Sequence, residues 1–259
     1  MILTIDIGNT NTVLGIYEDG HLKVSIRISS DSKKTVDEIA LFIDQIFTLR
    51  GEDVKKVEGA IVSSVVPVVT DNVIKAVKVL TGIQPLVVGP GTKTGLNVKY
   101  DDPREVGADR IVNAVGAIDK YGAPLIIIDF GTATTFCVID DKKNYLGGII
   151  SPGIGISAEA LFMKAAKLPK VDLSVPGKFL NKNTVDAIRA GLMYGAIGEV
   201  NYLVENLKSE TDTEDALVIA TGGLARTIAD NTDTIDIVDD ELTLWGLYKI
   251  YEKNITDRQ

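Results

Sequence analysis

The sequence predicts an α/β protein of two similar halves, each a mixed sheet with helices on its faces, and a cleft between the halves. Two observations support this fold class. Residues 2–16 and 125–139 share one pattern: an apolar strand, an Asp-x-Gly turn rich in small polar residues, and a second strand. The elements that follow each segment also come in the same order, which indicates an internal duplication.

The first half should contain three strands, a helix, a strand, a helix and a strand. Apolar residues at helical spacing predict a helix over 36–49, with Gly51 just beyond its end. A second helix is expected over 71–80, before Gly82. Pro67 should stop the fourth strand, because proline cannot donate to a strand ladder. Apolar runs bounded by turn residues predict strands at 2–7, 12–17, 22–29, 59–66 and 85–88.

The second half should repeat that order. The segment 89–122 links the halves, with a turn at 101–103 and a helix over 105–121. We therefore expect an N-terminal domain at 1–105 and a C-terminal domain at 106–259. The strands of the second half are predicted at 125–129, 134–139, 145–150, 217–220 and 234–238. Its helices are predicted at roughly 156–167, 184–207 and 241–253, with a further helix after residue 223.

Composition excludes several classes of protein. Apolar residues make up 45% of the 259 residues, which is enough for a sizeable core, and the net charge of −9 argues against a nucleic-acid partner. The chain has no apolar run long enough to span a membrane and no leader pattern, so we expect a cytoplasmic protein without a membrane partner. The single cysteine, Cys137, allows no internal disulfide, and the single histidine, His21, is expected at a solvated turn.

The two Asp-x-Gly loops carry the strongest functional signal. Glycine lets the backbone approach a ligand closely, and amide and threonine hydroxyl groups can bind an anion. Asp6 in the first loop and Asp129 in the second can each hold a cation or a water beside that anion. Either loop alone could be an ordinary hairpin turn. Two loops at equivalent places in a duplicated chain predict a clamp for phosphate groups.

Other motifs leave alternatives open. Ala-Thr-Gly-Gly at 220–223 suits either a backbone that packs against an adenine or ribose, or a plain helix entry. Asp109 and Arg110 begin a helical stretch and are either a solvated pair or a base beside an anion-binding arginine. The run 153–158 fits a dinucleotide fingerprint but lacks its opening βαβ unit, and 89–95 resembles a P-loop only in composition.

Together these residues resemble type III pantothenate kinase, in the superfamily of acetate and sugar kinases, heat-shock-70 ATPases and actin. Residues 6–12 are similar to the family's first phosphate motif and residues 129–135 to its second. Residues 102–110 are similar to its substrate motif, and 147–153 to a further family run. The resemblance covers essentially the whole chain and implies a duplicated actin-like ATPase (ribonuclease H-like) fold.

The resemblance also implies an activity and a set of site residues. The activity is ATP-dependent phosphorylation of the primary hydroxyl of pantothenate, by a homodimer that needs potassium or ammonium. Asp109 would be the general base, and Asp129 would bind the monovalent cation. ATP would be bound by Asp6, Ile7, Gly8, Asn9, Thr10, Asn11, Thr12, Val13 and Thr132. Pantothenate would be bound by Tyr100, Gly107, Ala108, Asp109, Arg110 and Thr184, of which Tyr100 and Thr184 rest on shorter matches.

Elementary chemistry agrees with these roles. An alcohol that attacks a γ-phosphate must lose a proton, and a carboxylate within hydrogen-bond reach can accept it. Arg110 suits the pantothenate carboxylate, and Asp6 suits Mg²⁺ or its waters beside the phosphates. The rival hypotheses are another small-molecule kinase on the same scaffold, an actin-like filament subunit or chaperone ATPase, and a nucleotide-binding regulator without catalysis.

Overall fold

The structure is a computed structural model that describes residues 1–255 of the chain. Two compact units make up the chain, and neither is continuous in sequence. The first, unit 1, contains residues 1–96, 102–119 and those from Leu242 on, whereas the second, unit 2, contains 97–101 and 120–241. The units are defined by which residues pack together. A helix near the C-terminus packs with the first half of the chain and therefore belongs to unit 1. The predicted domain boundary between residues 105 and 106 divides the two duplicated halves of the sequence, and it stays a prediction.

Unit 1 is built on a five-stranded mixed sheet with the order β3-β2-β1-β4-β5. Its middle strand, β1, pairs antiparallel with β2 and parallel with β4, and β3 and β5 form the edges. The strands are β1 (Ile2–Ile7), β2 (Asn11–Glu18), β3 (His21–Ser29), β4 (Gly59–Ser64) and β5 (Leu86–Val87). Each of these lies where an apolar run predicts a strand.

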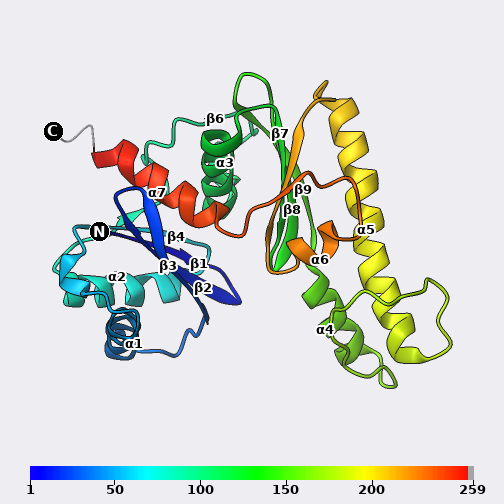
Figure 1. The fold of residues 1–259 in the computed structure, drawn as a ribbon, viewed down its shortest axis with the longest axis horizontal. Helices are drawn as coiled ribbons and strands as arrows, with labels where there is room; N and C mark the ends of the chain where they lie inside the picture. The colour runs from blue at the N-terminus through cyan, green and yellow to red at the C-terminus, as the bar shows by residue number, and fades with distance from the viewer. Residues whose placement is uncertain (256–259) are drawn as a thin grey trace. The chain divides into compact units, whose positions relative to one another are not determined.

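Two helices, α1 (Val36–Leu49) and α2 (Pro67–Thr81), cover one face of this sheet (Figure 1). α1 begins with a capping box, in which the Thr35 hydroxyl accepts from the Glu38 amide and the Glu38 carboxylate accepts from the Thr35 amide. α2 begins at Pro67 and not at residue 71 as predicted. Proline fits the first turn of a helix because its missing N–H would have no helical partner there.

The other face of the unit 1 sheet is covered by α7 (Leu242–Ile255), which packs against β1, β2 and β4 (Figure 1). Gly59 in β4 lies directly against Tyr251 of α7. A Cβ at this glycine would lie only 1.7 Å from the Tyr251 hydroxyl oxygen. α3 (Ala108–Tyr121) shares this core, whose buried members are Ile61, Val88, Val112, Val115, Leu247 and Ile250. The helix predicted over 105–121 begins three residues later than expected, because residues 103–105 form a 3-10 turn.

Unit 2 repeats the topology of unit 1. Within its six-stranded sheet, the run β9-β8-β7-β10-β11 has the same order and the same strand directions as β3-β2-β1-β4-β5. This correspondence confirms the predicted duplication. The strands are β7 (Leu125–Phe130), β8 (Ala133–Ile139), β9 (Asn144–Pro152), β10 (Leu217–Gly222) and β11 (Ile237–Val238). A further short strand, β6 (Asn97–Val98), pairs with β9 and was not predicted.

The helices of unit 2 pack on one face of its sheet. They are α4 (Ile154–Lys164), α5 (Thr184–Glu210) and α6 (Ala225–Ala229), and Figure 1 shows the long α5 beside the strands. Their apolar side chains join those of β7, β8 and β10 in one core, among them Ile126, Ile128, Phe136, Met193, Val200 and Val218. The helix predicted over 156–167 is shifted toward the N-terminus by about two residues.

Candidate functional site

The first predicted phosphate loop is a tight turn, residues 8–10, held by its neighbours. The Gly8 amide donates to the Asn11 carbonyl at 2.9 Å. Ser30 donates its hydroxyl to the Gly8 carbonyl at 2.6 Å and lies 2.9 Å from the Thr12 hydroxyl. Because these bonds fix the turn from both sides, its remaining amide groups keep a set direction, as an anion-binding turn requires.

Asp6 lies on the α7 face of the unit 1 sheet. Alternate residues of a strand face opposite sides. Thr4 is on the same face as Asp6, and a Cβ at neighbouring Gly15 would lie 2.6 Å from the Thr4 hydroxyl and 3.0 Å from Leu244 of α7. The intervening residues of β1 instead enter the core beneath α1 and α2, namely Leu3, Ile5 and Ile7. Asp6 therefore projects on the same side of the sheet as α3 and α7.

Asp109 lies in the first turn of α3, with its carboxylate folded back over the start of the helix. Its Oδ1 accepts a hydrogen bond from the Arg110 amide at 2.8 Å. A Cβ at Gly107 would lie 2.5 Å from the same oxygen, so a side chain there would push this carboxylate out of its present position. Arg110 is 6% exposed, which is unusual for a residue that always keeps its charge. A buried arginine beside a half-buried aspartate is an arrangement suited to a small anionic substrate.

The preceding turn has its own closed hydrogen bonds. Asp102 accepts bonds from the Arg104 amide and from the Nε and Nη2 atoms of its guanidinium group at 2.8 to 3.0 Å. These bonds hold the pKa of the Asp102 carboxyl below its usual value. Asp102 and Arg104 therefore shape the entry to α3, whereas Asp109 and Arg110 lie in its first turn.

α7 positions the helix that bears Asp109. A Cβ at Gly246 would lie 2.0 Å from the Val112 carbonyl oxygen, and one at Gly116 would lie 2.7 Å from the Leu242 carbonyl oxygen. The Thr243 hydroxyl donates to Asn113 at 2.7 Å across the same contact. The two helices thus meet backbone to backbone, which fixes α3 on the face of the sheet where Asp6 projects.

The second predicted phosphate loop, in unit 2, is shorter. It consists of Gly131 and Thr132 between β7 and β8. The Gly131 amide donates to the Ala133 carbonyl at 3.1 Å, and the Gly153 amide donates to the Thr132 carbonyl at 3.2 Å. A Cβ at Gly153 would lie 2.2 Å from that same carbonyl oxygen. The glycine of the apparent dinucleotide motif therefore serves to support this loop.

Asp129 lies at the end of β7, on the sheet face opposite α5. It is the register partner of Thr221 in β10. Gly222 follows in a left-handed conformation, with φ of +95°, and a Cβ there would lie 2.7 Å from Oδ1 of Asp129. Residues 220–223 thus come directly beside the second loop, and the missing side chain of Gly222 leaves space around the Asp129 carboxylate.

The remaining two predicted substrate residues also belong to unit 2. The Tyr100 ring lies 6.4 Å from the Tyr145 ring, and a Cβ at Gly147 would lie 3.7 Å from Tyr100. Thr184 is the exposed first residue of α5, directly after its N-cap Asn183. The predicted site residues therefore form two groups. Unit 1 holds Asp6 to Val13 and Gly107 to Arg110, and unit 2 holds Tyr100, Asp129, Thr132 and Thr184.

Sequence reasoning missed a buried charged cluster around Asp239 in unit 2. The Asp239 side chain is 7% exposed and accepts from Lys120 Nζ at 2.7 Å and from the Tyr121 hydroxyl at 2.8 Å. Burial, and then this hydrogen bond, raise the pKa of Tyr121 to about 12. The only sequence signal is an aspartate directly after a short strand, which is also typical of a turn.

We expect this cluster to make stability fall at high pH. The pKa of Tyr121 is higher in the folded protein than its usual value of 10.0. The stabilisation is therefore complete below pH 10 and lost as the pH rises through about 12. Asp239→Asn should lower the free energy of unfolding at pH 7 by about 1–3 kcal/mol, because it weakens the charge-assisted hydrogen bonds of a part-buried ion pair. Urea denaturation at pH 7, 10 and 12 measures both effects, and an equal midpoint for the variant at pH 7 would contradict the prediction.

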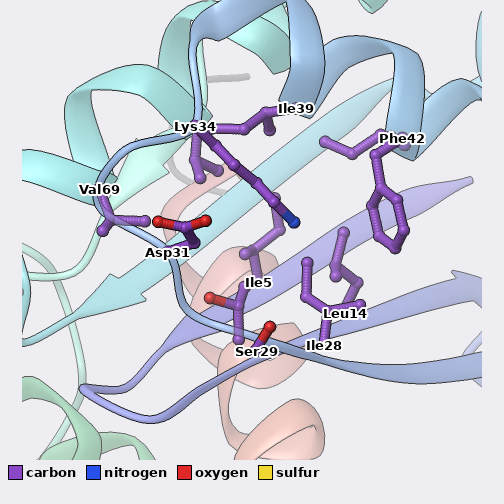
Figure 2. Close-up of a pocket in the computed structure, with 12 residues that line it drawn as sticks. Ile5, Leu14, Ile28, Ser29, Asp31, Lys34, Ile39, Phe42 and Val69 are labelled. Carbon is purple, nitrogen blue, oxygen red and sulfur yellow. The ribbon is translucent and has the colours of Figure 1, made fainter.

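A cavity lies on the opposite face of the unit 1 sheet, beneath α1 and α2. Figure 2 shows Lys34 extending across it, and its Nζ lies 5.2 Å from the Phe42 ring centroid. Of the predicted site residues, only Thr12 lines it. Its walls are mainly apolar, with Ile5, Leu14, Ile28, Ile39, Ile43, Val69 and Val73 among them. This cavity is therefore separate from Asp6 and Asp109, which belong to the other face.

The donor groups indicate which metals the chain could hold. Residues 1–255 contain no cluster of three or more His, Cys, Asp or Glu side chains that could form a metal cage. An isolated carboxylate at a loop suits Mg²⁺, which keeps several waters and shares phosphate oxygens with one or two carboxylates. Across the same described part of the chain, no helix is both long and apolar enough to cross a membrane.

The chain is similar to known proteins over nearly its whole length. The family model of type III pantothenate kinase matches residues 2–206. A type III pantothenate kinase of Bacillus cytotoxicus is 52% identical over 254 residues, which cover 98% of this chain and 97% of that protein.

Two solved structures share the fold. One, described as a Baf family transcriptional activator from Campylobacter jejuni, has a TM-score of 0.62 at 20% identity, covering 98% of this chain and 99% of that one. The other, component A of (R)-2-hydroxyglutaryl-CoA dehydratase from Acidaminococcus fermentans, has a TM-score of 0.55 at 13% identity and covers 96% of each chain. At these identities the likeness concerns the duplicated actin-like fold alone.

Proposed function

The chain belongs to the type III pantothenate kinase family, and we propose how its residues carry out the reaction that this membership assigns to it. The reaction is the phosphorylation of pantothenate by ATP, the first step of coenzyme A biosynthesis. One observation supports a residue-level account above all others. In each unit the first strand of the duplicated segment, β1 or β7, carries an aspartate as its residue before last and is followed by a turn that begins with glycine. These aspartates are Asp6 and Asp129.

The two turns bind the phosphate groups of ATP in this proposal. Residues 6–13 form the first contact, through the amide groups of a turn that Ser30 holds in place. Thr132 forms the second, from a loop that Gly153 supports. Backbone amides favour phosphate without a strongly basic surface, which is consistent with the net charge of −9.

Asp109 acts as the general base. The primary hydroxyl oxygen of pantothenate attacks the γ-phosphorus and forms a new P–O bond, while the bond to the β,γ-bridging oxygen breaks and ADP leaves. The hydroxyl proton passes to the Asp109 carboxylate, which Gly107 leaves unobstructed. Arg110 binds the pantothenate carboxylate, and Gly107, Ala108, Tyr100 and Thr184 complete the substrate contacts.

Cations neutralise the charge that the phosphates bring. Mg²⁺ accompanies ATP, and we propose that Asp6 binds this ion or one of its waters. Mg²⁺ keeps several waters and is usually bound by only one or two carboxylates together with phosphate oxygens. Asp129 binds a monovalent cation, potassium or ammonium. The space beside its carboxylate, which a Cβ at Gly222 would fill, supports this assignment.

We expect Asp129→Asn to weaken the response to potassium. Loss of an outer-shell partner alone costs about 10- to 100-fold in metal affinity, so loss of a direct carboxylate should cost at least about tenfold. The half-saturating potassium concentration, measured at saturating ATP and pantothenate, tests this. Asp212→Asn, in a loop far along the chain from both turns, is the charge-matched control. An unchanged potassium response in Asp129→Asn would remove the assignment.

The protein is proposed to work as a cytoplasmic homodimer with no nucleic-acid or membrane partner. Large apolar side chains on α4 and in the segment after it are exposed, and an interface between two copies of the chain would cover them. They include Phe162, Met163, Phe179 and Leu180, at 48 to 84% exposure. Sedimentation equilibrium tests the dimer.

A coupled assay of ADP release tests the whole proposal. We expect ADP release in the presence of pantothenate and potassium, and little with ATP alone. A panel of sugars and other alcohols separates this activity from that of another small-molecule kinase. Phosphorylation of a sugar and not of pantothenate would reject the substrate assignment, and no transfer to any acceptor would favour a nucleotide-binding regulator.

A further inference from the structure

Ser63 is a buried hydroxyl group at the edge of the proposed phosphate site. It is the residue before last in β4, and its side chain is fully buried, at 0% exposure. Within the part of the chain that the structure describes, its Oγ atom has no hydrogen-bond partner. Nearly all buried polar groups in native proteins have a partner, so an exception commonly marks a place for water or a ligand.

Ser63 lies next to Asp6. The two residues are register partners in the parallel pair of β1 and β4, so their side chains leave the sheet on the same face. That face is the one toward α7, because Gly59 and Ile61, which alternate with Ser63 along β4, contact that helix and its core. Both residues also lie near the carboxyl ends of their strands, where ligands of open α/β sheets bind.

The second half of the duplication repeats this arrangement. Asp129 is the register partner of Thr221, which is 3% exposed and lies near the end of β10 as Ser63 lies near the end of β4. Both strands are otherwise apolar up to this point. A small hydroxyl side chain thus stands beside the loop aspartate in both halves, although the two loops differ in length.

Neighbouring hydroxyl groups have structural partners, which sets Ser63 apart. The Ser64 hydroxyl accepts from the Val66 amide at 2.9 Å and from the Thr70 hydroxyl at 2.6 Å. The Thr4 hydroxyl, on the same sheet face, donates to the Gly15 carbonyl at 3.2 Å. Hydrogen bonds within the fold therefore account for the hydroxyl groups of Thr4 and Ser64, but not for the buried hydroxyl group of Ser63.

We propose that Ser63 is a positioning residue for Asp6. This inference rests on the proposed function. When the magnesium nucleotide is bound, the Ser63 hydroxyl donates a hydrogen bond to the Asp6 carboxylate, or to the water it shares with it, and so holds one carboxylate oxygen toward the hydrated cation. Outer partners of this kind fix the direction of a ligand and change metal affinity without touching the metal.

The test measures cation binding directly. Mn²⁺ replaces Mg²⁺, and its binding to the protein–ADP complex is followed by electron paramagnetic resonance. We expect Ser63→Ala to weaken Mn²⁺ binding about tenfold. Ser63→Thr should bind within about twofold of the unmodified protein, because threonine keeps the hydroxyl and is the residue found at the equivalent place in β10. In the kinase assay, half-saturating Mg²⁺ should rise in parallel for Ser63→Ala, while KM for pantothenate changes little.

Thr4→Ala is the matched control, because it also removes a fully buried hydroxyl on this sheet face. It breaks a hydrogen bond that is formed, so it should lower Tm without weakening Mn²⁺ binding. Ser63→Ala should leave the Tm of the ligand-free protein equal or higher, because it removes a polar atom with no partner. A lower Tm with unchanged Mn²⁺ binding would show a structural role for Ser63 and overturn the proposal.

The two proposals fail in distinguishable ways. If the unmodified protein does not phosphorylate pantothenate, the proposed function fails, but the Mn²⁺ measurement with ADP still reports on Ser63. If the kinase reaction is present and Ser63→Ala binds Mn²⁺ as tightly as the unmodified protein, only the positioning role is wrong.

Discussion

Replacing Asp109 with asparagine should lower kcat by about 10²- to 10⁴-fold, the range typical of a general base. The substituted amide keeps the size of the side chain and can still accept a hydrogen bond from the Arg110 amide, which lies 2.8 Å from Oδ1. It cannot accept the proton of the pantothenate hydroxyl. We therefore expect loss of turnover with little change in Tm or in nucleotide affinity. Steady-state kinetics, thermal denaturation and calorimetric titration with ADP measure the three quantities.

A second aspartate on the same helix is the control. Asp119 accepts from the Trp245 indole at 2.9 Å and lies near Lys249, so Asp119→Asn should affect stability more than kcat. Normal turnover in Asp109→Asn would remove its assigned role. Unfolding of Asp109→Asn would show that the carboxylate is needed for the structure, and the assignment of a base would then lose its support.

The substitution Gly246→Ala, which adds a single methyl group, is expected to have the second large effect on stability and turnover. A Cβ there would lie 2.0 Å from the Val112 carbonyl oxygen, which is a backbone atom and cannot swing aside. α7 and α3 must then separate, and Asp109 moves with α3. Overpacking of this kind costs about 1–3 kcal/mol, and here it should exceed the roughly 1 kcal/mol that alanine gains over glycine in a helix. We expect Gly246→Ala to unfold at lower urea concentration and to lose kcat.

The matched control is Gly198→Ala in α5. A Cβ at this glycine would have no neighbour within 4 Å, so only the gain in helix propensity remains. This variant should be as stable as the unmodified protein or more so. If both variants changed stability in the same direction, the close contact between α3 and α7 would not be what fixes α3.

Much of the fold was predictable because its signals are local. The strands shared by both halves lie within apolar runs that are bounded by turn residues. The helix at 36–49 has the predicted bounds. The loop aspartates lie at equivalent strand ends because the duplication preserved the pattern. Pro67 shows where a local rule misled: β4 already ends at Ser64, two residues before the predicted end, and Pro67 begins the next helix four residues earlier than predicted.

Other features depend on residues far apart in the sequence. β6 has only two residues, and its pairing with β9 has no signature in its own composition. The packing of α7 against β1 and β4 joins the end of the chain to its beginning. Neither Gly222 beside Asp129 nor Gly246 beside Val112 could be inferred from spacing, since each matters through an atom on another element.

The sequence by itself determined the strand and helix order, the duplicated Asp-x-Gly turns and the family to which these motifs belong. Periodicity and turn chemistry act over a few residues, so they can be seen without knowing the fold. Only the tertiary structure decided which face of each sheet the aspartates use, which hydroxyl lies beside each of them and which helix holds Asp109. Those relations are set by strand register and close helix contacts, which connect residues separated by tens to hundreds of positions.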